Sequence, residues 1–158
     1  MTNNYPLPPR SIYYDEVISY CDTLIEKITD FNPTEIIGVA RSGMPFATFI
    51  AQKMHLDLGY YNPTYEIFKT CHDIKGARLL FVDENFVTGK TQAQIKNLMK
   101  DKIDTEYKIG CIMLDLFCPD RDCEYGKDLD FWATDIACFF KPYLIEEKGN
   151  KYRDKNSI

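Results

Sequence analysis

Residues 79–91 give the clearest indication of the fold and read Leu79-Leu80-Phe81-Val82-Asp83-Glu84-Asn85-Phe86-Val87-Thr88-Gly89-Lys90-Thr91. Its first four residues are apolar, and a run of that length suits a strand buried on both faces. Two carboxylates follow where the chain is expected to leave the sheet, and the last four residues open a helix. The stretch therefore predicts a strand, a polar turn and a helix in direct succession, which is the local unit of an α/β fold.

The turn at 88–91 has the composition of a phosphate cradle. Gly89 lets the backbone approach a ligand closely, and the free amides of a first helical turn point toward an anion. The two threonine hydroxyls add donors. Asp83 and Glu84 would repel a phosphate beside them, but they suit hydroxyl groups or a metal ion. A sugar phosphate carries hydroxyls and phosphate together, so the stretch predicts a site for such a ligand.

Two other interpretations of the same residues remain. In a P-loop of the nucleoside triphosphatases, Lys90 would lie over the phosphate and Thr91 on Mg²⁺. That motif needs a second glycine five residues before Gly89, where this chain has Glu84, so the P-loop interpretation largely fails. A purely structural strand and capped helix explains Thr88 and the glycine singly, but it explains the adjacent carboxylates less well.

Helical and strand patterns alternate on both sides of this stretch. Helices are expected from Ser11 to about Asp30, from Pro45 to about Met54 and over 90–102, and strands over 35–40, 56–61, 77–82, 107–117, 131–133 and 138–143. This alternation predicts a doubly wound, mainly parallel sheet flanked by helices. Ligands of such sheets bind beyond the carboxyl ends of the strands, where the turns at 41–43 and 83–91 both fall.

Length and composition set further limits. The 158 residues suffice for one domain: an arm over 1–10, a core with a C-terminal hood over 11–145, and a polar tail over 146–158. The net charge of −5 argues against general nucleic-acid binding. No stretch is long enough to span a membrane, and the first ten residues lack the apolar segment of a secretion signal. The six cysteines are therefore expected to be reduced thiols of a cytoplasmic protein rather than zinc ligands.

The stretch 79–91 resembles the PRPP-binding motif of the type I phosphoribosyltransferases, which take 5-phosphoribosyl 1-diphosphate (PRPP) as a substrate. Residues 37–45, Ile37-Gly38-Val39-Ala40-Arg41-Ser42-Gly43-Met44-Pro45, resemble the pyrophosphate loop of the same family. Both motifs follow a predicted strand, and they occur in the family's order, which is more specific than either motif alone. The resemblance covers roughly residues 11–145.

This resemblance implies a role for each motif residue. Asp83 and Glu84, with Arg41, would be catalytic: the two acids would bind the ribose hydroxyls and, through PRPP, Mg²⁺. The 5-phosphate would be held by Val87, Thr88, Gly89, Lys90 and Thr91. The pyrophosphate would be held by Arg41 and the turn residues Ala40, Ser42 and Gly43, and the family often has a cis peptide in this turn, here expected at Ala40–Arg41.

Two further segments could complete the site. The loop over 62–75 is a candidate lid, with Tyr65, Lys69 and His72 able to reach in, or else a plain surface connection. The hood at 117–143 would cover the base, and its aromatic side chains, among them Phe131, Trp132, Phe139 and Phe140, could stack on a planar ring or belong to the core.

Val87 and Cys118 depart from the purine-specific pattern of the family, in which an acid and a lysine are usual at these places. The resemblance therefore implies an enzyme that moves phosphoribose from PRPP to a nitrogenous base with release of pyrophosphate, and not a standard 6-oxopurine enzyme. The alternative is a PRPP- or nucleotide-binding regulator or a catalytically degenerate homologue. Relatives of this type are frequently dimers, so the resemblance also implies a homodimer.

Overall fold

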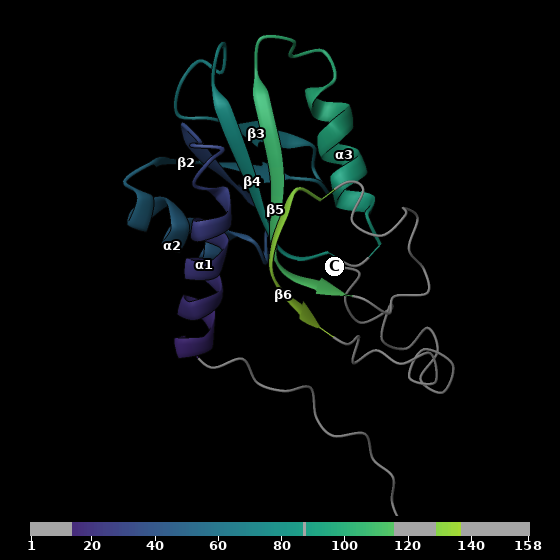
Figure 1. Ribbon diagram of the computed structural model, residues 1–158. Coiled ribbons are helices and arrows are strands. Elements are labelled where there is room, and N and C mark those ends of the chain that lie inside the picture. The colour runs from purple at the N-terminus through teal and green to yellow at the C-terminus, as the bar shows by residue number, and fades with distance from the viewer. Residues whose placement is uncertain (1–13, 87, 116–128, 137–158) are drawn as a thin grey trace, which may run out of the picture.

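The fold is a six-stranded sheet with helices on both faces. The computed structural model describes residues 14–86, 88–115 and 129–136. Its elements are α1 (Tyr14–Ile28), β1 (Glu35–Val39), α2 (Met44–Met54), β2 (Asp57–Asn62), β3 (Ile67–Lys69), β4 (Arg78–Phe86), α3 (Lys90–Met99), β5 (Glu106–Asp115) and β6 (Phe131–Ile136). The strands follow the order β3-β2-β1-β4-β5-β6, and all neighbours are parallel except β2 and β3. The doubly wound, mainly parallel fold expected from the sequence is confirmed (Figure 1).

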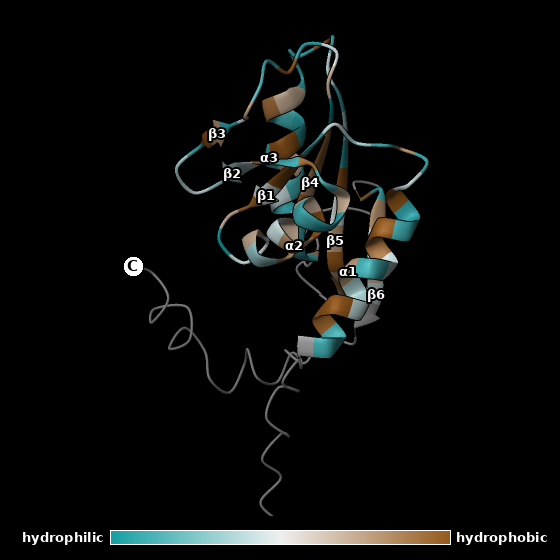
Figure 2. Ribbon diagram, turned by 90° about the vertical axis from the view of Figure 1, so that its left-hand side faces the viewer, coloured by the Kyte–Doolittle hydropathy of each residue, from teal (hydrophilic) through white to brown (hydrophobic). Residues whose placement is uncertain are grey.

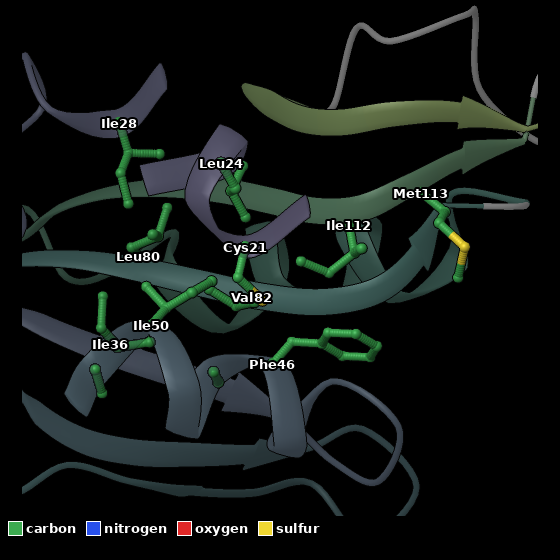
Figure 3. Close-up of a cluster of buried hydrophobic side chains, with 12 residues drawn as sticks. Cys21, Leu24, Ile28, Ile36, Phe46, Ile50, Leu80, Val82, Ile112 and Met113 are labelled. Atoms are coloured by element: carbon green, nitrogen blue, oxygen red, sulfur yellow. The ribbon is translucent and has the colours of Figure 1, made fainter. Parts of the chain in front are cut away.

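The first apolar layer lies between the sheet and the helices α1 and α2. One face of α1 is apolar, with Cys21, Leu24 and Ile28 fully buried. These side chains and those of α2 converge on Leu80 and Val82 of β4 (Figure 3). The alternation of hydrophobic and hydrophilic residues along α1 is visible in Figure 2, so burial of one helix face accounts for its place on the sheet.

The second apolar layer lies on the other face of the sheet, under α3. Leu79 and Phe81 of β4 point into it together with Ile95 and Met99 of α3. Because successive residues of a strand face opposite sides of the sheet, β4 contributes side chains to both apolar layers. This explains why its first part reads as a continuous apolar run.

Three elements differ from the sequence expectation. β4 continues to Phe86 instead of ending at Val82, because the segment after the acids still pairs with β5, through Asn85↔Met113 and Phe86↔Leu114. The segment 62–75 contains β3, which pairs with β2 as an antiparallel hairpin. α3 ends at Met99 rather than near residue 102.

Some expectations concern residues outside the described ranges, namely the arm, the polar tail, most of the hood and the strand expected over 138–143. In the described part of the chain, no helix combines the length and apolar character needed to cross a bilayer.

Candidate functional site

The two turns singled out from the sequence lie side by side at the carboxyl edge of the sheet. β1 and β4 are parallel neighbours, with Gly38 paired to Val82, so the turn after β1 begins beside Asp83 and Glu84 in the last part of β4. The contact is close, because a methyl group on Gly43 would lie 2.5 Å from the Val82 carbonyl oxygen and 2.9 Å from Asp83 Cα. Only glycine fits there, and its absent side chain lets the 40–43 turn press against the start of the acid pair.

The turn at 40–43 leaves a cationic side chain free to meet a ligand. The Ala40–Arg41 peptide bond is cis, as the resemblance led us to expect. The amide of Ala40 donates to the Tyr61 carbonyl at 2.7 Å, and that of Gly43 donates to the Val39 carbonyl at 2.9 Å. Both amides are therefore occupied by backbone carbonyls in this structure, and the part of Ala40 and Gly43 in holding pyrophosphate stays a prediction. Arg41 and Ser42 are exposed at the edge.

The acid pair combines a buried and a half-buried carboxylate. Asp83 is 8% exposed, and its Oδ1 accepts a hydrogen bond from the backbone amide of Glu84 at 2.8 Å. Burial raises the pKa of Asp83 to about 6, the amide bond opposes this rise, and the neighbouring Glu84 charge adds to it. Register pairing with β5 passes from Asp83↔Cys111 to Asn85↔Met113 and skips Glu84. The acids thus lie within β4, whose pairing with β5 is interrupted only at Glu84, rather than in a free loop.

The cradle residues stand at the start of α3. Gly89 stands at the N-cap with φ 85°, a left-handed conformation that favours glycine, and as a glycine it offers no side chain to cap the first turn. The Thr88 hydroxyl accepts from the Lys90 amide at 3.3 Å. Lys90 is exposed and Thr91 is half-buried. Amides of a first helical turn have no acceptor inside the helix, so this end of α3 can receive an anion. Val87 lies outside the described residues.

Two polar residues at this edge were not singled out from the sequence. The Oδ1 of Asn85 and the Nε2 of Gln92 are buried and have no hydrogen-bond partner among the described residues. Gln92 is 2% exposed. Its spacing of three from Ile95, which is inward on the same helix, was the available signal, because residues three apart share a helix face.

The residues of the candidate lid, 62–75, lie at both edges of the sheet. Tyr65 is 72% exposed in the turn after β2, at the carboxyl edge, and this turn contacts α3 through Gln94 Nε2, which donates to the Pro63 carbonyl at 3.3 Å. His72 lies near the start of β2, where its Nε2 is 2.7 Å from Asp57 Oδ2. β3 runs away from the site, so the structure does not bring His72 to it. Lys69 is exposed and pairs in register with Tyr60.

The proposed base pocket is described only in part. Trp132 pairs in register with Cys111 and packs against the apolar layer under α3. Lys27 Nζ lies 5.5 Å from the centre of its ring. The Trp132 ring therefore has contacts in the core, which was the alternative to stacking on a base. Phe139 and Phe140 lie outside the described residues.

The acid pair fits a metal ion that a phosphorylated ligand brings with it. No group of three or more metal-ligating side chains occurs among the described residues, so this part of the chain offers no complete cage. Mg²⁺ commonly uses one or two carboxylates together with substrate phosphates and water. Asp83 and Glu84 meet that requirement, since only one oxygen of Asp83 is taken by the backbone amide.

Comparison with known sequences finds relatives of one kind. An orotate phosphoribosyltransferase from Sulfurisphaera tokodaii is 26% identical over 157 residues, a match that spans 94% of this chain and 77% of the relative. One from Saccharolobus solfataricus is 33% identical over 93 residues, which span 53% of this chain and 43% of that protein. No family model matches the chain.

Solved structures with a similar fold include further phosphoribosyltransferases. A purine phosphoribosyltransferase from Pyrococcus horikoshii Ot3 has a TM-score of 0.63 and 23% identity, covering 79% of this chain and 85% of that one. An orotate phosphoribosyltransferase from Aeropyrum pernix has a TM-score of 0.61 and 18% identity, covering 87% and 78%. At these identities the structures establish the fold, and the match to the relative from Sulfurisphaera tokodaii covers nearly the whole chain. The chain therefore has the fold of the phosphoribosyltransferases and is similar in sequence to two orotate phosphoribosyltransferases.

Proposed function

We propose that this protein is an enzyme that transfers the 5-phosphoribosyl group of PRPP to a nitrogenous base and releases pyrophosphate. The observation that carries the proposal is the contact between the two turns at the carboxyl edge. With Gly43 pressed against Asp83, one edge presents an exposed arginine, a carboxylate pair and the start of a helix. These groups match the three parts of PRPP: diphosphate, ribose hydroxyls and 5-phosphate.

The chemistry assigns a distinct task to each group. The bond between the anomeric carbon and the diphosphate oxygen breaks, and its electron pair leaves on pyrophosphate. A ring nitrogen of the base forms the new bond to that carbon and passes any proton it carries to water. Arg41 supplies fixed positive charge to the leaving group. Asp83 and Glu84 hold the ribose hydroxyls, and the turn at 88–91 holds the 5-phosphate.

A bound Mg²⁺ would neutralise charge that builds on the departing pyrophosphate. In our proposal Asp83 and Glu84 contact this ion through the PRPP that carries it. The protein also has to keep water from the anomeric carbon, since water would otherwise hydrolyse PRPP. The turn that carries Tyr65 lies at the carboxyl edge of the sheet, beside the site, where it would contribute to this exclusion of water.

For the acceptor we propose an orotate-like pyrimidine rather than a 6-oxopurine. The support is the absence of an acid at Val87 and of a lysine at Cys118, together with the orotate phosphoribosyltransferases among the relatives. We further propose that the protein works in the cytoplasm as a homodimer. Cys21 and Cys71 are free thiols, as a reducing compartment would leave them.

Calorimetric titration with PRPP, with and without Mg²⁺, tests the site. We expect magnesium-dependent binding that the double variant Asp83→Asn, Glu84→Gln loses. A matched control is Asp101→Asn, Glu106→Gln, which makes the same change of charge at two exposed residues near the opposite edge. Absence of binding at millimolar PRPP would refute the proposal. An assay of pyrophosphate release with orotate or hypoxanthine then identifies the acceptor, and binding without turnover would favour a regulator.

A further inference from the structure

The interface between β4 and α3 changes from apolar to polar toward the site. Phe81 of β4 and Ile95 of α3 belong to one buried apolar cluster. β4 runs toward the carboxyl edge and α3 runs away from it. Two residues further along the strand stands Asp83, and three residues back along the helix stands Gln92. The periodicities of strand and helix therefore place Asp83 on the side of β4 that faces α3 and Gln92 on the side of α3 that faces the sheet, each toward the site.

Burial and register support this placement. Asp83 alternates with Phe81, so it faces the α3 side of the sheet, and its register partner Cys111 belongs to the same apolar cluster. Asp83 is 8% exposed and Gln92 is 2% exposed. Two polar side chains thus close an otherwise apolar interface, and both are nearly shielded from water.

Each of the two groups has unused hydrogen-bonding capacity. Gln92 Nε2 has no partner in the described part of the chain. Asp83 Oδ1 accepts from the Glu84 amide, while none of the described residues is found donating to its Oδ2. A buried amide without an acceptor is costly, and so is a buried carboxylate with too few donors. Such groups in a native structure call for a functional explanation.

We propose that Gln92 is a positioning residue for Asp83, an inference that rests on the proposed function. When the ribose hydroxyls of the ligand donate to the Asp83 carboxylate, Gln92 Nε2 donates to the same carboxylate from the buried side. The ligand requires the ionised form of Asp83, and that form requires further donors in a water-poor interior. A neutral amide supplies one and fixes the orientation of the carboxylate, as partners behind ligand-binding groups commonly do.

The test is to replace the amide with an apolar side chain of similar length, Gln92→Met. The matched control is Gln94→Met, on the same helix, where the amide donates to the Pro63 carbonyl instead. Calorimetry would compare ribose 5-phosphate with its 2,3-dideoxy analogue, which lacks the hydroxyls that Asp83 binds. For Gln92→Met we expect affinity for ribose 5-phosphate to fall by about tenfold to a hundredfold. Affinity for the dideoxy analogue should change by less than about twofold. Gln94→Met should change the two affinities by the same factor, because its amide contacts the turn that carries Tyr65 and not the ribose hydroxyls.

A second readout is the unfolding midpoint of the ligand-free protein, which should not fall in Gln92→Met, because the variant removes an unpaired buried amide. Equal loss for both ligands would overturn the inference, since it would show a general structural role. Unchanged affinity for ribose 5-phosphate would also overturn it while leaving the proposed function intact. Failure of the wild-type protein to bind PRPP would overturn both. If Gln92→Met and Gln92→Leu both failed to fold, the expectation that the unfolding midpoint does not fall would be wrong, and the inference would be wrong with it.

Discussion

The buried polar groups at the two edges of the sheet differ in whether they have hydrogen-bond partners. At the amino edge, Glu35 is 3% exposed and accepts a hydrogen bond from the Cys71 amide at 2.8 Å. At the carboxyl edge, the buried atoms Asn85 Oδ1 and Gln92 Nε2 have no partner, and they are the two such side-chain atoms in the described part of the chain. Asp83, also at this edge, has a raised pKa because it is buried.

We interpret this difference as a division between groups that stabilise the fold and groups that would bind the proposed ligand. A buried polar group with its partner adds to stability, whereas one without a partner subtracts from it. Sites that are locally unfavourable in an otherwise consistent structure are expected where function requires them. We therefore expect that removing a buried polar group lowers the free energy of unfolding at the amino edge and raises it at the carboxyl edge.

The largest contrast should come from one carboxylate at each edge. Asp83→Asn removes a buried charge that is costly at neutral pH, so we expect the free energy of unfolding to rise by up to about 3 kcal/mol. PRPP binding should weaken by more than about tenfold. Glu35→Gln weakens a satisfied hydrogen bond, so the free energy of unfolding should fall by about 1 kcal/mol. Urea unfolding at neutral pH measures both, and effects of the same sign would contradict the division between the edges.

The pH dependence of stability sharpens the same contrast. Burial raises the pKa of Asp83 from 3.8 to about 6, so between these values the native state binds more protons than the unfolded state. The contribution of Asp83 to the unfolding free energy therefore falls as pH rises from about 4 to 6 and levels off above that range. Asp83→Asn lacks this contribution. The difference in unfolding free energy between variant and wild type should grow over this window, and a constant difference would place the titration elsewhere.

A smaller effect is expected where the two turns meet. A methyl group on Gly43 would lie 2.5 Å from the Val82 carbonyl oxygen, and the backbone must shift to admit it. Gly43→Ala should therefore lower the free energy of unfolding by about 1–3 kcal/mol and weaken PRPP binding, because the turns separate. The control is Gly110→Ala, whose added methyl group would meet its nearest neighbours at 3.6 Å. That contact is ordinary, so Gly110→Ala should be nearly neutral in both assays.

Much of this architecture could be predicted from local patterns. The buried strand at 79–82, the inward faces of the helices and the neighbouring turns follow from apolar periodicity and from the rule for parallel sheets. The continuation of β4 to Phe86 could not be predicted, because it depends on pairing with β5, a partner distant in sequence. Gln92 was missed for a related reason. Its chemistry indicates an exposed helix position, and only the packing of α3 on the sheet buries it.

The position of His72 shows the same limit and supplies the smallest expected effect. Sequence proximity suggested that it could reach the site with Tyr65, but the antiparallel turn into β3 takes it to the amino edge, where it pairs with Asp57 in an exposed contact. Exposed ion pairs contribute little to stability. His72→Ala should therefore leave both the unfolding midpoint and the affinity for PRPP unchanged, whereas Tyr65→Ala, at the carboxyl edge, should lower the affinity. A clear loss of PRPP affinity in His72→Ala would mean that the 67–72 segment reaches the site when ligand binds, and the two edges would then no longer act separately.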